Sequence, residues 1–205
     1  MKKILVALLA LLLVAVPLYA MGKSKGKQNN LKEYGKQMMV IETDLGNITI
    51  AFFPNAAPKH CQQIEKLAKD GFFNGCMFHR VIPGFVIQAG DPLTKDPSKK
   101  AMWGTGRSTL PNIPAEFNSI SHTKGMVGAA RSQDPNSANS QFYICVGDAT
   151  FLDGQYTVFG EVVKGMDVAE AISRVPRNAQ DCPNKNVEIK KAYLIETPAG
   201  QEKSK

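Results

Sequence analysis

Short stretches with strand-like composition recur along most of this chain and are separated by turns that contain glycine or proline. Two segments are predicted helices. Residues 58–70 have a proline in the first turn, an apolar face and Gly71 after the end, and residues 166–174 follow Gly165 and stop near Pro176. Many short strands with two helices favour an antiparallel barrel or sandwich, because a parallel sheet requires alternating strands and helices. The predicted strands are residues 38–44, 47–53, 76–81, 85–90, 125–130, 141–146, 157–163 and 187–195.

Residues 92–115 form a long segment with neither strand nor helix periodicity. The segment contains four prolines and two glycines, together with the single tryptophan of the chain, Trp103. Loops of this length are usually functional or mobile.

The N-terminus has the three parts of a secretory signal. Lys2 and Lys3 precede an apolar run over residues 4–16, and Ala20 provides a small residue for cleavage. The run is shorter than the roughly 20 apolar residues of a membrane-spanning helix. We therefore expect a periplasmic or secreted protein with no stable membrane insertion, whereas an uncleaved leader would anchor it. The expected organisation is a signal peptide at 1–20, a lysine-rich linker at 21–37, one domain at 38–196 and a polar tail at 197–205.

The net charge of +7 does not indicate a nucleic-acid-binding face. Residues 1–36 contain seven lysines and one acid, so residues 37–205 contain 18 basic and 17 acidic side chains. The predicted domain is therefore nearly neutral, and we expect no nucleic-acid partner. The basic leader and linker leave open the alternative of a basic adhesin tethered to the envelope.

The four cysteines are Cys61, Cys76, Cys145 and Cys182, and their wide spacing matches no metal-binding motif. We expect no metal site. An even number of cysteines in an exported protein permits disulfides with three alternative pairings, while buried free thiols remain the other interpretation.

Two of the predicted strands place a glutamine beside an apolar side chain on the same face. Strand alternation puts Val86 with Gln88, and Gln141 with Tyr143. Burial of unpaired amides is costly, so these faces are expected to line a half-dry groove on the outside of the sheet. Exposed strand glutamines without any groove remain the alternative.

Arg80 stands near this groove in the segment Phe78–Asp91, which contains no evident nucleophile or pair of acids. A guanidinium offers several fixed donors and keeps its charge near neutral pH. Such a donor could stabilise a peptide bond to proline during rotation, because the twisted nitrogen regains a lone pair. An arginine beside a histidine is also a common surface pair, so the pattern alone leaves both readings open.

Four motifs together closely resemble the cyclophilin family of peptidyl-prolyl cis/trans isomerases. The resemblance runs in order from about residue 38 to residue 196. It implies a mostly β fold, namely a closed eight-stranded antiparallel β-barrel capped by two α-helices, with the active groove on its outer surface. The motifs are Phe78–Asp91, Ser140–Cys145, Leu152-Asp153-Gly154 and Val158-Phe159-Gly160.

The resemblance also implies the activity and its residues. It implies an enzyme that accelerates rotation about Xaa-Pro bonds during protein folding, without a cofactor, as a monomer acting on proline-containing peptides and unfolded proteins. It assigns catalysis to Arg80, substrate orientation to Gln88 and Gln141, and backbone pairing with the peptide to Ala130 and Arg131. The remaining substrate-binding residues that it implies are Phe85, Val86, Tyr143, Phe151, Leu152 and Tyr156.

This chain departs from common family members at several positions. Tyr143 stands where many members have Phe, and Phe151 where many have a Trp associated with tight cyclosporin binding. The loop at 92–115 does not match the common forms. A module that binds proline-containing segments without catalysis would share the same groove, and the retention of Arg80 favours the enzyme.

Overall fold

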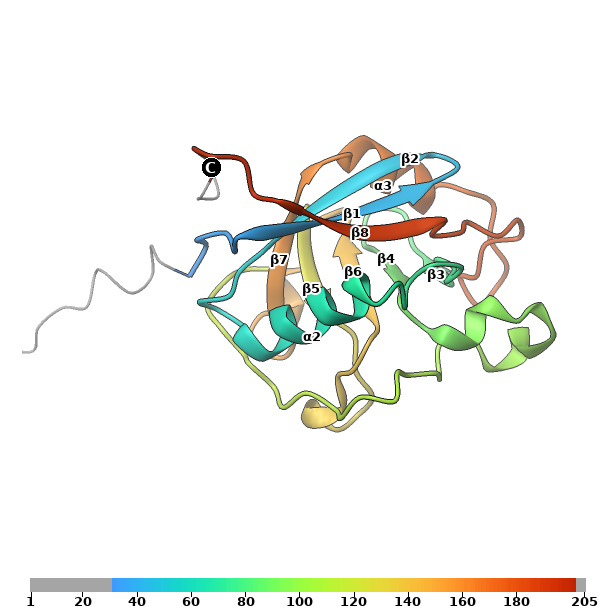
Figure 1. The fold of residues 1–205 in the computed structure, drawn as a ribbon. Helices are drawn as coiled ribbons and strands as arrows, with labels where there is room; N and C mark the ends of the chain where they lie inside the picture. Colours follow the sequence, from blue (N-terminus) through green and yellow to red (C-terminus); the bar gives the residue numbers. More distant parts are fainter. Residues whose placement is uncertain (1–30, 202–205) are drawn as a thin grey trace, which may run out of the picture.

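One curled sheet of eight strands forms the frame of the protein. The computed structural model describes residues 31–201, and all strand pairings in it are antiparallel (Figure 1). The order across the sheet is β3-β4-β6-β5-β7-β2-β1-β8. In chain order the strands are β1 (Gln37–Thr43), β2 (Gly46–Phe52), β3 (Arg80–Val81), β4 (Val86–Ala89), β5 (Met126–Ala129), β6 (Phe142–Cys145), β7 (Val158–Lys164) and β8 (Lys191–Glu196).

The expected closed barrel is wrong, because the sheet is an open, curled half-barrel. Strands β3 and β8 occupy the two edges and do not pair with each other. At the seam, residues 75–78 and the segment before β8 are joined by one isolated bridge, Met77 with Glu188, and by three backbone hydrogen bonds, namely Phe78 N to Val187 O, Gly75 N to Ile189 O and Ile189 N to Cys76 O. The physical reason is that β3 is only two residues long and is followed by Pro83, so it offers too short an edge for a ladder.

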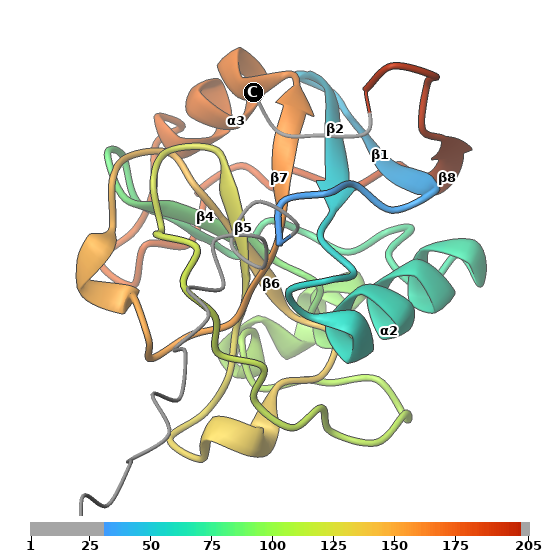
Figure 2. The same cartoon turned by 90° about the vertical axis from the view of Figure 1, so that its left-hand side faces the viewer.

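Two α-helices in residues 31–201 lie at opposite ends of the curled sheet (Figures 1 and 2). Helix α2 (Pro58–Lys69) starts with proline at its first turn, where the missing N–H costs nothing. Helix α3 (Met166–Ser173) follows Gly165, which has a positive φ of 84°. Both helices bury one apolar face, and their positions agree with the helices predicted at residues 58–70 and 166–174.

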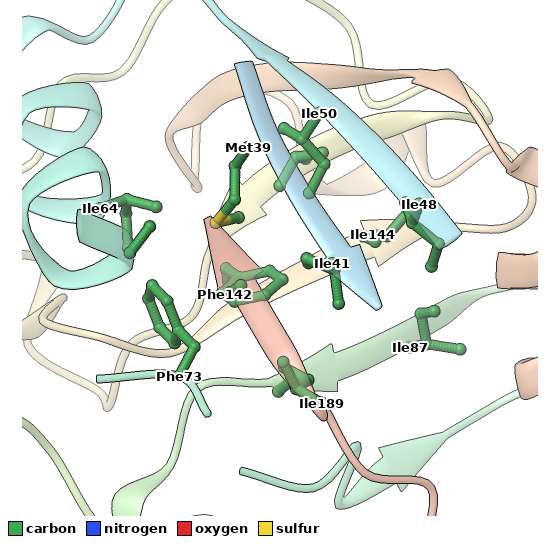
Figure 3. Packing of buried hydrophobic residues seen from close by; sticks show 14 of the residues in the cluster. Met39, Ile41, Ile48, Ile50, Ile64, Phe73, Ile87, Phe142, Ile144 and Ile189 are labelled. Carbon is green, nitrogen blue, oxygen red and sulfur yellow. The ribbon is translucent and has the colours of Figure 1, made fainter. Parts of the chain in front are cut away.

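The core fills the inside of the curl (Figure 3). Alternate residues of β1 and β2 point inward, as do Ile87 of β4 and Phe142 and Ile144 of β6. Ile64 of α2 packs on the same cluster from one end. Because period-two alternation buries these side chains, the opposite faces of β4 and β6 are left for the outer surface.

The long loop expected at 92–115 contains two short 3-10 helices, η1 (Pro92–Lys95) and η2 (Pro97–Met102). Each begins at an Asp-Pro pair. Asp91 accepts a hydrogen bond from Leu93 N, and Asp96 accepts one from Ser98 N. Two aspartate N-caps therefore give residues 92–102 of this loop a defined structure.

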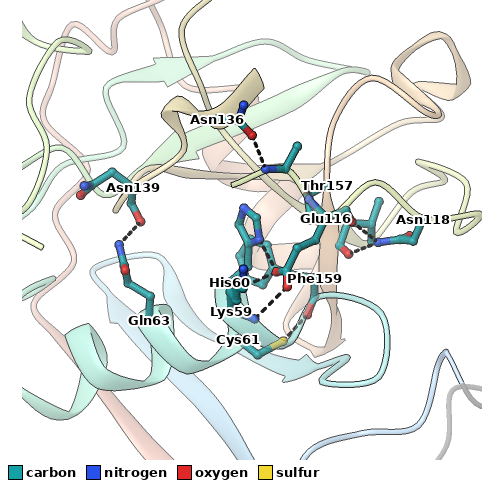
Figure 4. Close-up of polar contacts among 12 residues, drawn as sticks. Lys59, His60, Cys61, Gln63, Glu116, Asn118, Asn136, Asn139, Thr157 and Phe159 are labelled. Carbon is teal, nitrogen blue, oxygen red and sulfur yellow. Dashed lines mark hydrogen bonds and ion pairs between the residues drawn. The ribbon is translucent and has the colours of Figure 1, made fainter. Parts of the chain in front are cut away.

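The first turn of α2 is held by a carboxylate from a distant loop (Figure 4). Ala57 at the N-cap has no side-chain acceptor, and Glu116 takes that role instead. Its two oxygens accept from Lys59 N at 3.1 Å and from His60 N at 3.0 Å, and the His60 ring lies 2.6 Å from Oε2. This contact fixes residues that follow the long loop against the helix.

The expected signal peptide at 1–20 lies outside the described residues, as does most of the linker at 21–37. The described part of that linker packs on the domain, since the Tyr34 ring stacks on Phe53 and Gly35 N donates to Phe52 O. None of the helices in residues 31–201 has the length and hydrophobicity that a bilayer crossing requires.

Candidate active site

The short hairpin of β3 and β4 places Arg80 directly opposite Gln88. Nη1 of Arg80 lies 3.5 Å from Oε1 of Gln88, and its guanidinium carbon lies 5.9 Å from the centre of the Phe85 ring. Among the described residues no carboxylate forms an ion pair with Arg80. The half-buried guanidinium therefore retains donors for a ligand.

An apolar cluster on the outer face of β4 and β6 lies next to this arginine. The strand register pairs Val86 with Cys145 and Gln88 with Tyr143, so these residues share the face away from the core. We call the set the outer apolar cluster. Its buried members are Val86, Tyr143, Cys145 and Ala149, and its partly exposed members are Phe85, Ala130, Leu152 and Tyr156.

The outer apolar cluster suits a small apolar ring. Val86 and Tyr143 are almost fully buried, while the Phe85 and Tyr156 rings stay partly open to solvent. Phe151 is 64% exposed, with its ring centre 5.4 Å from that of Phe85. Contact with such a surface removes water, which strengthens the field of a nearby cation.

The two glutamines form one hydrogen-bonded chain with the long loop. Nε2 of Gln88 donates to Oε1 of Gln141 at 2.9 Å. Nε2 of Gln141 donates in turn to Gly104 O at 3.0 Å and to Gly106 O at 2.7 Å. Gln141 therefore has its amide committed to the loop, and Gln88 is the amide that contacts the arginine.

Ala130 and Arg131 follow β5 along the same surface. Ala130 N donates to Gln141 O at 3.0 Å. The Arg131 guanidinium lies 4.3 Å over the Tyr156 ring and donates to backbone oxygens, including Gln155 O at 2.9 Å. The Arg131 side chain thus connects the loop that follows β5 to the loop at Gln155. A peptide on this surface would therefore contact mainly the backbone of Ala130 and Arg131.

The sequence did not predict a row of hydrogen-bonded side chains that lies buried behind Tyr143. The ring of His122, which is fully buried, lies between Asp153 Oδ1 at 2.8 Å and the Tyr143 hydroxyl at 3.0 Å. A Cβ on Gly128 would approach the Tyr143 hydroxyl to 2.4 Å, so glycine provides its space. The signal was the tyrosine itself, because a buried hydroxyl needs a partner. Burial raises the pKa of Tyr143, which keeps its hydroxyl protonated.

Asp91 is a second residue that the sequence reasoning did not single out. Its side chain is fully buried and accepts from Leu93 N at 2.7 Å, Gly104 N at 2.5 Å and Gly106 N at 3.2 Å. One carboxylate thus fixes the loop that holds Gln141. The Gly90 backbone makes this possible, since it has a φ of 93° and a Cβ there would lie 2.3 Å from Ser140 O.

Two cavities flank the amide chain, and both include Gln88 and Gly104. One, of about 450 Å³, is bounded by Thr105, Ala130 and Ser137. The other, of about 620 Å³, lies beside Arg80 and Trp103. Residues 31–201 contain no cluster of three or more His, Cys, Asp or Glu side chains that could hold a metal ion.

Comparison with known proteins gives a consistent result. The family model described as "Cyclophilin type peptidyl-prolyl cis-trans isomerase/CLD" matches residues 38–194. A "Probable peptidyl-prolyl cis-trans isomerase" of Brucella abortus is 48% identical over 139 residues, covering 66% of this chain and 71% of that protein. A peptidyl-prolyl cis-trans isomerase of Acinetobacter baylyi is 38% identical over 161 residues, covering 74% of this chain and 82% of that protein.

The fold comparison includes two crystal structures of one Cryptosporidium parvum cyclophilin-type isomerase. The first has a TM-score of 0.71 at 25% identity and covers 79% of this chain and 99% of that chain. The second, in the presence of the dipeptide Ala-Pro, has a TM-score of 0.70 at 25% identity and covers 78% and 99%.

Proposed function

This chain belongs to the cyclophilin-type peptidyl-prolyl cis-trans isomerase family, which catalyses isomerisation of Xaa-Pro bonds, and we propose that Arg80 and the outer apolar cluster form its active site. The proline ring of a peptide would rest on Val86 and Tyr143, between the rings of Phe85 and Tyr156. The single observation that carries this assignment is an arginine with no carboxylate partner among residues 31–201, beside an apolar surface.

The proposed mechanism requires no covalent intermediate. Rotation about a peptide bond has a barrier of about 18–20 kcal/mol because it destroys amide resonance. In the twisted state the proline nitrogen has a lone pair, and Arg80 donates a hydrogen bond to it. This bond is stronger in the twisted state than in the planar state, which is the condition for acceleration.

Gln88 serves Arg80 by holding one edge of its guanidinium at 3.5 Å. Gln141 and the loop carbonyls hold Gln88 in turn, so the donor direction is set before substrate binds. Preorganisation of this kind reduces the reorganisation needed in the twisted state. Ala130 and Arg131 supply backbone groups along which the peptide lies extended.

The test is an exchange assay on a cis-proline peptide with the chain and with an Arg80→Ala variant. The proposal expects faster cis/trans exchange by the native chain and loss of most of that rate in the variant. Binding of the peptide without faster exchange would instead indicate a module that only captures proline-containing segments.

The proposal also covers the substrates of the protein and its location in the cell. The Cryptosporidium relative was crystallised in the presence of Ala-Pro, which supports proline-containing peptides and unfolded proteins as substrates here. Lys2, Lys3 and the apolar run at 4–16 support export to the periplasm or the cell exterior, with action as a monomer on proteins that fold there. Mass spectrometry of the N-terminus from fractionated cells tests cleavage after Ala20, and light scattering tests the monomer.

A further inference from the structure

The cavity of about 620 Å³ beside Arg80 is not used by the mechanism above. It lies between the long loop and the segment that precedes β8. Arg80 and Gln88 line it on the side of the active site, and Asn178 and Gln180 line it on the far side. A peptide that extends from the proposed proline position past Arg80 would reach this cavity, because Arg80 and Gln88 border both.

The charged side chains that line this cavity are both positive. They are Arg80 and Lys100, and no Asp or Glu lines it. Lys100 forms no ion pair with any described residue, and its ammonium lies 5.3 Å over the Trp103 ring. The neighbouring Lys99, by contrast, pairs with Asp96 at 3.3 Å. Lys100 is therefore an exposed cation that no carboxylate among residues 31–201 pairs with, and it is open to a ligand carboxylate.

The acids on the elements around the cavity are already engaged. Asp91 is buried and accepts the loop N–H groups. Asp96 accepts from Ser98 and Lys99. Asp181, next to the lining residue Gln180, pairs with Arg177 at 3.0 Å. None of them offers its charge to Lys100.

A buried polar ring also lines the cavity. His79 is 6% exposed, and neither of its ring nitrogens has a hydrogen-bond partner among the described residues. Burial lowers the pKa of His79, so near neutral pH its ring adds no positive charge to the cavity.

We propose that this cavity is a second subsite, which takes the carboxylate side chain of an Asp or Glu residue near the substrate proline and pairs it with Lys100. The subsite rests on the proposed function, because it presupposes that the peptide passes Arg80. The Lys100 ammonium lies over the Trp103 ring, and Trp103 is itself fixed by a hydrogen bond from Nε1 to Asp96 O at 3.3 Å. Asn178 and Gln180 add polar side chains to the lining of the cavity.

The test uses proline peptides that carry either Glu or Gln at each of the three positions before and after the proline. Glu and Gln have the same shape, so the ratio of their kcat/KM values isolates the charge. With the native full chain we expect a three- to fivefold preference for Glu at one position, typical of a partly exposed ion pair. The preference should fall toward one at high salt.

Three variants then test whether Lys100 is the cation that pairs with the Glu side chain of the peptide. Lys100→Gln should bring the Glu/Gln ratio close to one, while Lys100→Arg should keep it above one. Lys99→Gln is the matched control, because it removes a neighbouring charge that is already paired, and it should keep the native ratio. A ratio near one at all six positions, or a native ratio in Lys100→Gln, would overturn the subsite.

Failure of the subsite and failure of the proposed active site give different results. The Gln peptides alone report on isomerisation, so their turnover tests Arg80 and not Lys100. Calorimetric binding of the Glu and Gln peptides to the Arg80→Ala variant reads the Lys100 contact without turnover. A preference for Glu in that binding experiment supports the subsite, and equal binding counts against it.

Discussion

Nε2 of Gln88 donates a 2.9 Å hydrogen bond to Oε1 of Gln141, and this contact links the proposed catalytic arginine to the long loop. On one side Gln88 holds Arg80, and on the other Gln141 is held by Gly104 O and Gly106 O. The direction of the guanidinium therefore depends on a loop that is far from it in sequence.

Replacement of Gln141 by Leu should lower kcat/KM about tenfold. The change keeps the volume and removes three hydrogen bonds, each with a net contribution of about 0.5–1.5 kcal/mol, and so frees Gln88 and Arg80 to reorient. The measurement is exchange of a proline peptide. Gln63→Leu is the matched control, since that amide also donates to two backbone oxygens, Pro111 O and Asn139 O, away from the groove. Equal activity of the two variants would contradict the role of Gln141.

Replacement of Asp91 by Asn should destabilise the fold and loosen residues 92–107. The buried carboxylate accepts three backbone N–H groups, and hydrogen bonds to a charged group contribute about 1.5–3 kcal/mol each. We expect a loss of about 3 kcal/mol in urea unfolding and faster amide exchange in the loop. Asp96→Asn is the control and should change stability little, because this N-cap is exposed and Asn caps a helix about as well as Asp. Similar losses in both variants would show that Asp91 is not the anchor.

The sequence patterns predicted most of the elements and their faces. Alternation placed Val86, Gln88, Gln141 and Tyr143 on one outer face, because a pleated strand leaves only two orientations. The closed barrel was expected from the family resemblance, because alternation does not determine how the edges of a sheet meet, and that expectation was wrong. The strand predicted at 76–81 shortens to Arg80–Val81, since the residues before it hydrogen-bond to the segment that precedes β8.

The contacts behind the site were not predictable from spacing. His122 and Asp153 are 31 residues apart, and only the fold brings them to the Tyr143 hydroxyl. The Asp-Pro pairs at Asp91 and Asp96 did carry a readable signal for the two 3-10 helices, namely an N-cap followed by proline.

Acidification below pH 6.5 should lower the free energy of unfolding. Burial lowers the pKa of His60, although the hydrogen bond and the charge of Glu116 oppose it, and burial also lowers the pKa of His79. The unfolded chain therefore binds more protons than the folded one once the pH falls below 6.5. Stability is fully present above that value and declines as the pH falls toward the folded pKa values, by at most about 1.4 kcal/mol per pH unit for each histidine.

Urea unfolding between pH 8 and pH 5 measures this slope. His60→Gln should unfold more easily at pH 8 and should show a shallower slope below pH 6.5. A stability that stays constant or increases on acidification through this range would contradict neutral buried histidines.

The cysteines should react with a thiol reagent only slowly in the folded protein. All four are free and buried, and burial raises the pKa of Cys76 to about 11 and that of Cys145 to about 12. Because the thiolate is the reactive form, labelling at pH 8 should be slow until a denaturant is added, and four thiols should then react without reductant. Fewer than four would reveal disulfides that the structure lacks.

The most direct test of the account is turnover of a proline peptide by Arg80→Ala. Loss of one charged hydrogen bond in the twisted state should lower kcat/KM by about two orders of magnitude. Arg80→Lys should recover part of the rate, because it keeps the charge but not the rigid fork of donors. Both variants should unfold at nearly the native urea concentration, since Arg80 is half-buried and forms no ion pair with the described residues. An Arg80→Ala protein that is as active as the native chain would contradict the proposed mechanism.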